Sequence, residues 1–363
     1  MNKILYISPQ NTAGTLTYWK KFHEEMGNEC RYITFYRSKS NYPDDICLNL
    51  PFVGTNKLFS KIRESYYKFV TGNIVEQKHK EGFPPKWSPN NLFETIFFRI
   101  RDFIWYPIIN NIIKKHKLYD YDIYHFEWGE DLFRFGGFAS KLKKKGKPII
   151  CHYHGTDMRN RGVIPHMDEI SDLNLTNEPD LMLKHPSIEY LFLPFDVTSI
   201  TPRTKLNSKL KICHATTNRW NKGSDFIINI CEKLEKELNF EFVLIEGKTH
   251  SEALKIKSEC DINIDHVSTE AGWGYGMNSI EAMAQGLCPM VHLVADCEHY
   301  FPNHPFINIS AATLKTKIEF LIENPKVVFE KGQYARKWVL KHHHYSSVGK
   351  KLYSKYNNRG WLL

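Results

Sequence analysis

The chain has 363 residues, too many for one ordinary hydrophobic core and a suitable length for two α/β domains. Hydrophobic residues make up 42% and charged residues 25%, which excludes a disordered chain and fits a globular protein. The net charge of +9 indicates an anionic partner. Charge alone does not distinguish a phosphate-bearing substrate from a membrane surface or nucleic acid.

The N-terminal half begins as an α/β domain, which we place at residues 1–200. A strand at Ile4–Ile7 is followed by a loop that contains Gly14 and by a helix to about Met26. Its first apolar run is too short for a signal peptide, and no run reaches the roughly 18–20 apolar residues of a membrane span, so we expect a cytoplasmic protein. Further strands are predicted at 31–35, 122–126, 148–154 and 191–196.

Residues 40–118 do not follow the alternation of strands and helices, and we interpret them as an insertion. They contain a basic, aromatic helix at Lys57–Val70, a proline-rich break and an apolar helix at about Phe97–His116. The first helix has cations between apolar residues at near-helical spacing, a pattern that suits an anionic membrane surface. The simpler interpretation is that this helix packs on the sheet with a solvated basic face.

The C-terminal half, residues 201–345, alternates strands with helices and therefore predicts a parallel, doubly wound sheet. Strands are expected at 210–215, 240–246, 261–265, 290–293 and 306–309, and helices at 222–238 and 251–259. In such sheets ligands bind beyond the carboxyl ends of the strands. The tail, residues 346–363, is predicted to form a helix that crosses back to the first domain.

The cysteines and histidines give no metal motif. Eight cysteines are scattered without a CxxC pair, which predicts buried free thiols. The run His342–His344 lacks i, i+4 spacing, since three consecutive residues point different ways on a helix. We therefore expect no metal and no bound cofactor.

The most informative segment runs from Gly272 to Pro289 and reads as a glycine loop, a helix with one acid, Glu281, and a closing glycine. Glycine loops let backbone N–H groups approach a phosphate at the positive end of a helix. The acid one turn into the helix suits the hydroxyls of a ribose. The alternative is that the glycines only make a tight connection from strand to helix and that Glu281 only caps the first turn of that helix.

A second basic motif precedes this loop. Arg219 and Lys222 follow the strand at 210–215 and open a helix. Cations at a helix N-terminus oppose the helix dipole, so the placement favours a bound anion over a solvated helix start. Fixed cations of this kind would stabilise a departing diphosphate.

Together these motifs resemble glycosyltransferase family 4, over roughly residues 209–345. The matching segments are Arg219 with Lys222-Gly223, the strand that ends at Gly247, Asp261–Ile264, and the glycine loop with Glu281-Ala282-Met283. The resemblance implies an α/β fold of two Rossmann-like domains that face a central cleft, called GT-B. It also implies transfer of a sugar from a nucleotide-diphosphate donor to a glycan or lipid-linked acceptor, with retention of anomeric configuration and without a metal.

The resemblance also implies roles for individual residues. Catalytic roles fall to His154 and Asp157, which follow a buried strand in a segment similar to the family's, and to Arg219 and Lys222. Residues implied to bind the donor are Gly14, Arg219, Lys222, Gly274, Tyr275, Gly276, Met277, Asn278 and Glu281. Asp157 has a helix cap as its alternative role; His125, Glu127 and Glu130 are weaker candidates.

The chain departs from the family at one position. Family members carry two glutamates eight positions apart; Glu281 matches the second, but Trp273 stands at the first. Two alternatives therefore stay open: a nucleotide-sugar epimerase of similar fold, and a non-catalytic protein that binds a glycan or another partner. Nucleic acid is the weakest candidate partner, because the basic residues do not belong to a recognised binding module.

Overall fold

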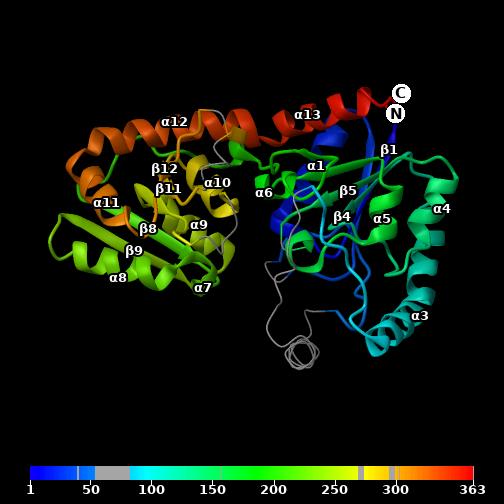
Figure 1. Ribbon diagram of the computed structural model, residues 1–363. Coiled ribbons are helices and arrows are strands. Elements are labelled where there is room, and N and C mark those ends of the chain that lie inside the picture. Colours follow the sequence, from blue (N-terminus) through cyan, green and yellow to red (C-terminus); the bar gives the residue numbers. More distant parts are fainter. Residues whose placement is uncertain are drawn as a thin grey trace. The chain divides into compact units, whose positions relative to one another are not determined.

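The computed structural model describes residues 1–38, 41–53, 82–155, 157–268, 274–293, 299–301 and 303–362. The chain divides into two compact units (Figure 1). Unit 1 contains Met1–Leu191 and Gly349–Leu363, and unit 2 contains Phe192–Val348.

Unit 1 is built on a seven-stranded sheet with the order β3-β2-β1-β4-β5-β6-β7, and every paired neighbour is parallel. The strands are β1 (Lys3–Ser8), β2 (Glu29–Thr34), β3 (Ile46–Cys47), β4 (Ile123–Glu127), β5 (Ile149–Tyr153), β6 (Leu173–Thr176) and β7 (Ile188–Tyr190). The central strands β4 and β5 are buried at every position, as expected for parallel strands with both faces covered.

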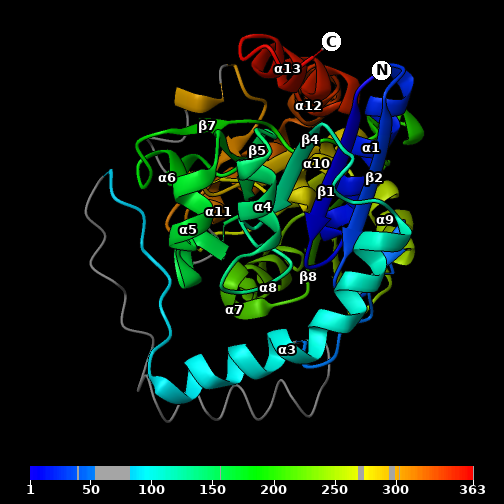
Figure 2. The same ribbon diagram turned by 90° about the vertical axis from the view of Figure 1, so that its right-hand side faces the viewer.

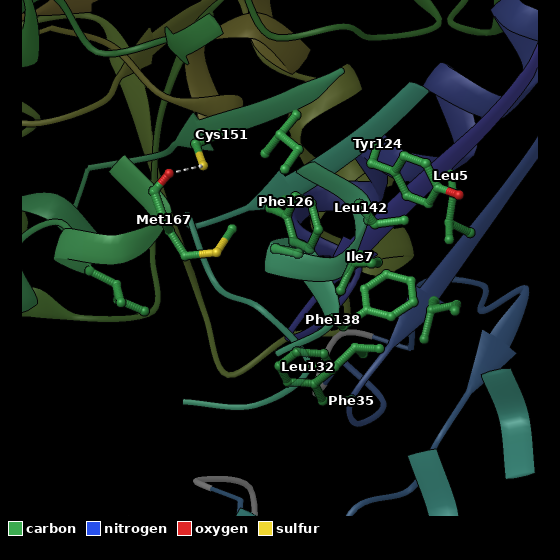
Figure 3. Close-up of a cluster of buried hydrophobic side chains, with 14 of the residues drawn as sticks. Leu5, Ile7, Phe35, Tyr124, Phe126, Leu132, Phe138, Leu142, Cys151 and Met167 are labelled. Carbon is green, nitrogen blue, oxygen red and sulfur yellow. Dashed lines mark hydrogen bonds between the residues drawn. The ribbon is translucent and has the colours of Figure 1, made fainter. Parts of the chain in front are cut away.

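Helices supply the rest of the core of unit 1. They are α1 (Thr15–Glu25), α3 (Leu92–Lys115), α4 (Phe138–Lys144), α5 (Pro165–Ile170) and α6 (Pro179–Met182). Figure 3 shows how Phe138 and Leu142 of α4 meet Leu5, Ile7 and Phe126 of the sheet, all of them buried. Burial of such apolar side chains is the main favourable term that holds the sheet and its helices together.

The last helix, α13 (Tyr345–Asn357), begins in unit 2 and ends in unit 1. Within unit 1, its Tyr353 hydroxyl lies 2.9 Å from Nδ1 of His23, and its Tyr356 hydroxyl is hydrogen-bonded to His125. Both histidines are buried, and burial lowers the pKa of His23 to about 3. His125 is therefore used in the packing of this helix.

Unit 2 contains a five-stranded parallel sheet with the order β12-β11-β10-β8-β9. The strands are β8 (Leu210–Thr216), β9 (Phe240–Glu246), β10 (Ile262–Ile264), β11 (Cys288–Val291) and β12 (Ile307–Asn308). The helices are α7 (Arg219–Lys222), α8 (Ser224–Leu234), α9 (His250–Ser258), α10 (Met277–Ala284), α11 (Leu314–Glu323) and α12 (Pro325–His343). Two parallel α/β sheets were expected from the sequence, and this part of the fold class is confirmed.

Two local expectations need correction, and a third cannot be compared with the structure. The strand predicted at 191–196 does not form: β7 ends at Tyr190, and only Phe195 makes an isolated bridge, to His344. The helix predicted from Lys222 breaks at Gly223, whose left-handed φ of 65° separates α7 from α8. The predicted helix at 57–70 lies outside the described residues.

Two further observations concern the cysteines and the hydropathy of the helices. All seven described cysteines are free, as expected. Among the helices in the described ranges, none is long and apolar enough to cross a bilayer.

Candidate functional site

The strand order of unit 2 indicates where a ligand would bind. The chain runs from β8 to its neighbour β9 and then returns to the other side of β8 as β10. The carboxyl ends of β8 and β10 therefore form a topological switch point, the usual ligand position in a doubly wound sheet. The segments that follow these two strands carry Lys222 and Asp265.

Lys222 and Asp265 meet at this switch point. Nζ of Lys222 donates to the Asp265 carboxylate at 2.7 Å and to the carbonyl of Ala215 at 3.0 Å. Asp265 also accepts from the Asn278 amide at 3.0 Å and the Ser279 hydroxyl at 2.6 Å, both in α10. Burial alone would raise the pKa of Asp265, but Lys222, His266 and Ser279 hold it well below its usual range. The first turn of α10 is thus fixed beside a cation.

The start of α10 has groups that suit an anion. Gly276 is its N-cap and offers no side-chain cap to the first N–H groups. Oδ1 of Asn278 and Oγ1 of Thr216, at the end of β8, are buried without a hydrogen-bond partner among the described residues. Buried unpaired polar atoms mark places where a ligand or water completes the hydrogen bonding. The first turn of α10 and Lys222 therefore both lie at the switch point.

Gly274 and Tyr275 serve to hold the loop. The carbonyl of Gly274 lies 2.8 Å from Nε2 of His266, on the segment after β10. The Tyr275 hydroxyl lies 2.7 Å from Nε2 of His343, and its ring packs against Phe306 with centroids 4.5 Å apart. The half-buried side chain of Tyr275 is thus packed against residues of unit 2.

Arg219 is placed differently from Lys222. Its guanidinium is paired with Glu246, at the end of β9, at 2.6 Å and with Asp225 of α8 at 2.9 Å. No described contact joins Arg219 to Gly274, Gly276 or the first turn of α10, so the two cations do not form one cradle in this structure. Its ion pairs are largely exposed and therefore weak, so exchanging them for a phosphate costs little.

Glu281 lies on α10 with both carboxylate oxygens engaged. Oε1 is 2.6 Å from Nε2 of His250, and Oε2 is 2.8 Å from Nζ of Lys257, which is almost completely buried. Burial would raise the pKa of Glu281, but Lys257 and His250 lower it, so the side chain is a carboxylate. Each oxygen keeps acceptor capacity for a ligand hydroxyl.

Unit 1 has a switch point of its own, between β1 and β4, because β2 and β4 lie on opposite sides of β1. Gly14 follows β1 and begins α1 with a φ of 74°; a Cβ there would lie 3.0 Å from the Tyr42 ring. Glu127 ends β4. Glycine at position 14 is thus favoured both by the left-handed backbone and by the close approach of the Tyr42 ring.

His154 follows β5 and pairs with Glu127. Nε2 of His154 is hydrogen-bonded to the Glu127 carboxylate, and Nδ1 lies 2.7 Å from Oδ1 of Asn177. Burial would lower the pKa of His154, but the Glu127 carboxylate raises it to about 9, so the imidazole is cationic at neutral pH. Asp157 accepts the backbone N–H of His154 at 2.9 Å and therefore caps this turn.

His152 completes a group that the sequence analysis missed. Its Nδ1 lies 3.6 Å from Glu127, and one ligand atom each from Glu127, His152 and His154 lie within 4.8 Å of one another. This set could hold a metal ion. The sequence signal was available, because residues 152 and 154 project from the same face of a strand. Glu130, a weaker candidate, is paired with Arg134 and Arg161.

Comparison with solved structures places the whole chain in one fold. The structure of HepE from Anabaena in complex with UDP-glucose matches with a TM-score of 0.57 at 11% identity. This match covers 99% of the present chain and 100% of the HepE chain. Sucrose-phosphate synthase from Thermosynechococcus elongatus matches with 0.60 at 12% identity (99% of both chains), and a glycosyltransferase from Rickettsia africae with 0.56 at 12% (98% of both). No protein-family description and no curated protein sequence matches. The two parallel sheets, of seven and five strands, therefore have the GT-B fold.

Proposed function

We propose that this protein is a glycosyltransferase that moves a sugar from a nucleotide-diphosphate donor to an acceptor hydroxyl on a glycan or lipid-linked chain. The observation that carries the proposal is the meeting of Lys222 with the first turn of α10 at the switch point of unit 2. The complex of HepE with UDP-glucose makes a UDP-sugar the first donor to test.

In this proposal the diphosphate sits at the N-terminus of α10. The N–H groups of Met277 and Asn278 and the charge of Lys222 face the phosphates, and the open N-cap at Gly276 leaves room for them. Asp265 fixes Lys222 in place through a short ion pair. Arg219 joins on donor binding by leaving its exposed partners, and Glu281 accepts from the ribose hydroxyls.

The chemistry assigned to the site is substitution with retention. The bond from the anomeric carbon to the phosphate oxygen breaks, and the bond to the acceptor oxygen forms on the same face of the sugar. The acceptor proton passes to the departing phosphate oxygen. Lys222 and the N–H groups stabilise the negative charge that grows on the diphosphate; a metal ion is not required for that task. NMR of the product anomer tests retention.

Residues of unit 1 carry proposed roles of their own. We assign His154 to a hydroxyl or phosphate oxygen of the donor, because Glu127 keeps its imidazole protonated and hence a charge-assisted donor. Asp157 positions His154 through the backbone contact. Gly14 lets a ligand approach the start of α1.

A screen of UDP-, GDP- and ADP-sugars by thermal shift tests the proposal, since a ligand that binds the folded state raises its apparent stability. The best donor is then incubated with the enzyme, and nucleotide release is measured. We expect Lys222→Met/Asp265→Asn, which removes both charges of the ion pair, to bind the donor roughly 10–100-fold more weakly. Lys236→Met, at an exposed position of unit 2, is the matched control.

A non-catalytic binding protein is the second candidate, and the engagement of Arg219 with Glu246 and Asp225 favours it. The same screen separates the two. A binding protein would be stabilised by a nucleotide or glycan but would release no nucleotide in a prolonged incubation. An enzyme would show slow donor hydrolysis even without its acceptor, and Lys222→Met/Asp265→Asn would abolish it.

A further inference from the structure

Helix α3 of unit 1 has two apolar faces, and only one of them faces the core. Trp105, Ile109 and Ile113 belong to the buried cluster of unit 1, and Nε1 of Trp105 donates to the carbonyl of Pro51 at 2.9 Å. These residues fix the orientation of the helix, because they recur at helical spacing on one side.

The opposite face carries large apolar side chains in the open. They recur at every fourth position, with phenylalanines between them, and the exposed fractions are high: Leu92 72%, Phe93 79%, Ile96 44%, Ile100 55%, Phe103 80%, Ile104 37% and Ile108 36%. Soluble proteins rarely expose apolar patches of this continuity unless the patch contacts a partner or a membrane. Figure 2 shows α3 as a long helix at the periphery of unit 1.

Aromatic residues extend this face onto the neighbouring loop. Phe135 is 41% exposed and lies under the Arg99 guanidinium, 5.6 Å from its ring centroid. Tyr106 of the helix is 57% exposed and contacts Phe133. Tyrosine and arginine of this kind suit the boundary between lipid tails and water, where an apolar body and a polar tip are both accommodated.

The charges on α3 are divided by sign. Its two acids are withdrawn: Glu94 is 5% exposed, and Asp102 is paired with Arg101 at 2.8 Å and accepts the N–H of Arg134. Its exposed charges are all positive, namely Arg99, Lys114 and Lys115. A surface that meets this face would therefore be apolar with a negative rim.

We propose that α3 docks in the plane of an anionic lipid membrane, with Leu92–Ile108 in the boundary between headgroups and tails. The helix is about 36 Å long at 1.5 Å per residue. Its exposed apolar face, with Arg99 beside it and Lys114 and Lys115 at its C-terminal end, suits an anionic membrane interface. A second copy of the chain would instead bring like charges together. The proposal stands on the helix itself and does not depend on the donor site in unit 2.

Vesicle flotation tests the proposal. Full-length protein is mixed with vesicles of phosphatidylcholine alone or of phosphatidylcholine and phosphatidylglycerol in equal parts. We expect co-flotation with the anionic vesicles, weakened by added salt, and a loss of about tenfold or more in partitioning for Phe93→Glu/Phe103→Glu. Phe320→Glu, at a 48% exposed position of α11, is the control and should float as the wild type does.

A loss of vesicle binding can be distinguished from misfolding and from a loss of nucleotide binding. Because both substituted side chains on α3 are exposed, circular dichroism and nucleotide binding should not change. Wild-type protein that stays at the bottom of the gradient with anionic vesicles overturns the proposal, as does undiminished flotation of Phe93→Glu/Phe103→Glu. If the wild type ignores vesicles but is a dimer by light scattering that Phe93→Glu/Phe103→Glu dissociates, the occupant is a second copy and the proposal is wrong.

Discussion

Removing the cation from the Lys222–Asp265 pair should destabilise unit 2 measurably. Loss of one partner of a buried ion pair typically costs 3–5 kcal/mol. Here the Lys222 side chain is 22% exposed, and Asp265 keeps its hydrogen bonds from Asn278 and Ser279. We therefore expect Lys222→Met to lower the free energy of unfolding by about 2–3 kcal/mol. For a unit of this size, that corresponds to a fall of about 4–12 °C in Tm.

The double variant Lys222→Met/Asp265→Asn tests whether the loss of stability comes from the carboxylate that Lys222→Met leaves unpaired. It removes the carboxylate that Lys222→Met leaves without its cation, so we expect it to be more stable than Lys222→Met in urea unfolding followed by circular dichroism. The pH dependence should agree. Since the folded pKa of Asp265 is depressed, its contribution is complete above its unfolded pKa near 4 and is lost as the pH falls below it. A coupling energy near zero between the two positions, or a Lys222→Met variant as stable as Lys236→Met, would refute the account.

Three further predictions concern other parts of the chain. Gly223→Ala should lower the free energy of unfolding by at least about 1–2 kcal/mol in urea titration, because its φ is 65° and a Cβ would lie 2.9 Å from a side chain of the loop after β10. NMR titration should find His154 with a pKa of about 9, and Glu127→Gln should return this pKa toward or below 6.5. The stabilising effect of the protonated His154 should be complete below about pH 6.5 and lost as the pH rises through 9. Lys257→Met should cost about 3 kcal/mol because it leaves Glu281 buried without its cation, and a near-neutral result in calorimetry would contradict the pairing.

The parallel α/β organisation could be predicted because each central strand is a short apolar run between turn signals. Phe240–Glu246 is predicted and observed with the same bounds, and Ile149–Tyr153 lies within its predicted strand. The failure at 191–196 has a physical reason. Leu191, Phe192 and Phe195 are buried by tertiary packing without pairing in a sheet. A segment buried in this way has the same short apolar run in its sequence as a buried strand.

The candidate site was predictable in position but not in pairing. The sequence placed Lys222 after one predicted strand and the α10 segment after another, and the structure joins them through Asp265. Side-chain partners depend on which acid the fold brings near, so neither Asp265 nor the Glu246 that engages Arg219 could be read from spacing. The same limit hid the pairing of Glu281 with Lys257.

Trp273, which stands where the family that the sequence resembles carries its first glutamate, lies outside the described residues. The donor's sugar therefore has to be found by screening.

Binding of a nucleoside diphosphate at the first turn of α10 is tested by a transverse-relaxation-optimised NMR titration of the wild-type protein with UDP, GDP and ADP. We expect one nucleoside diphosphate to shift the backbone amide signals of Met277 and Asn278 at saturation, and Lys222→Met/Asp265→Asn to weaken this response. Amide signals in the first turn of α10 that do not move with any of the three nucleotides, in a folded protein, would contradict this expectation.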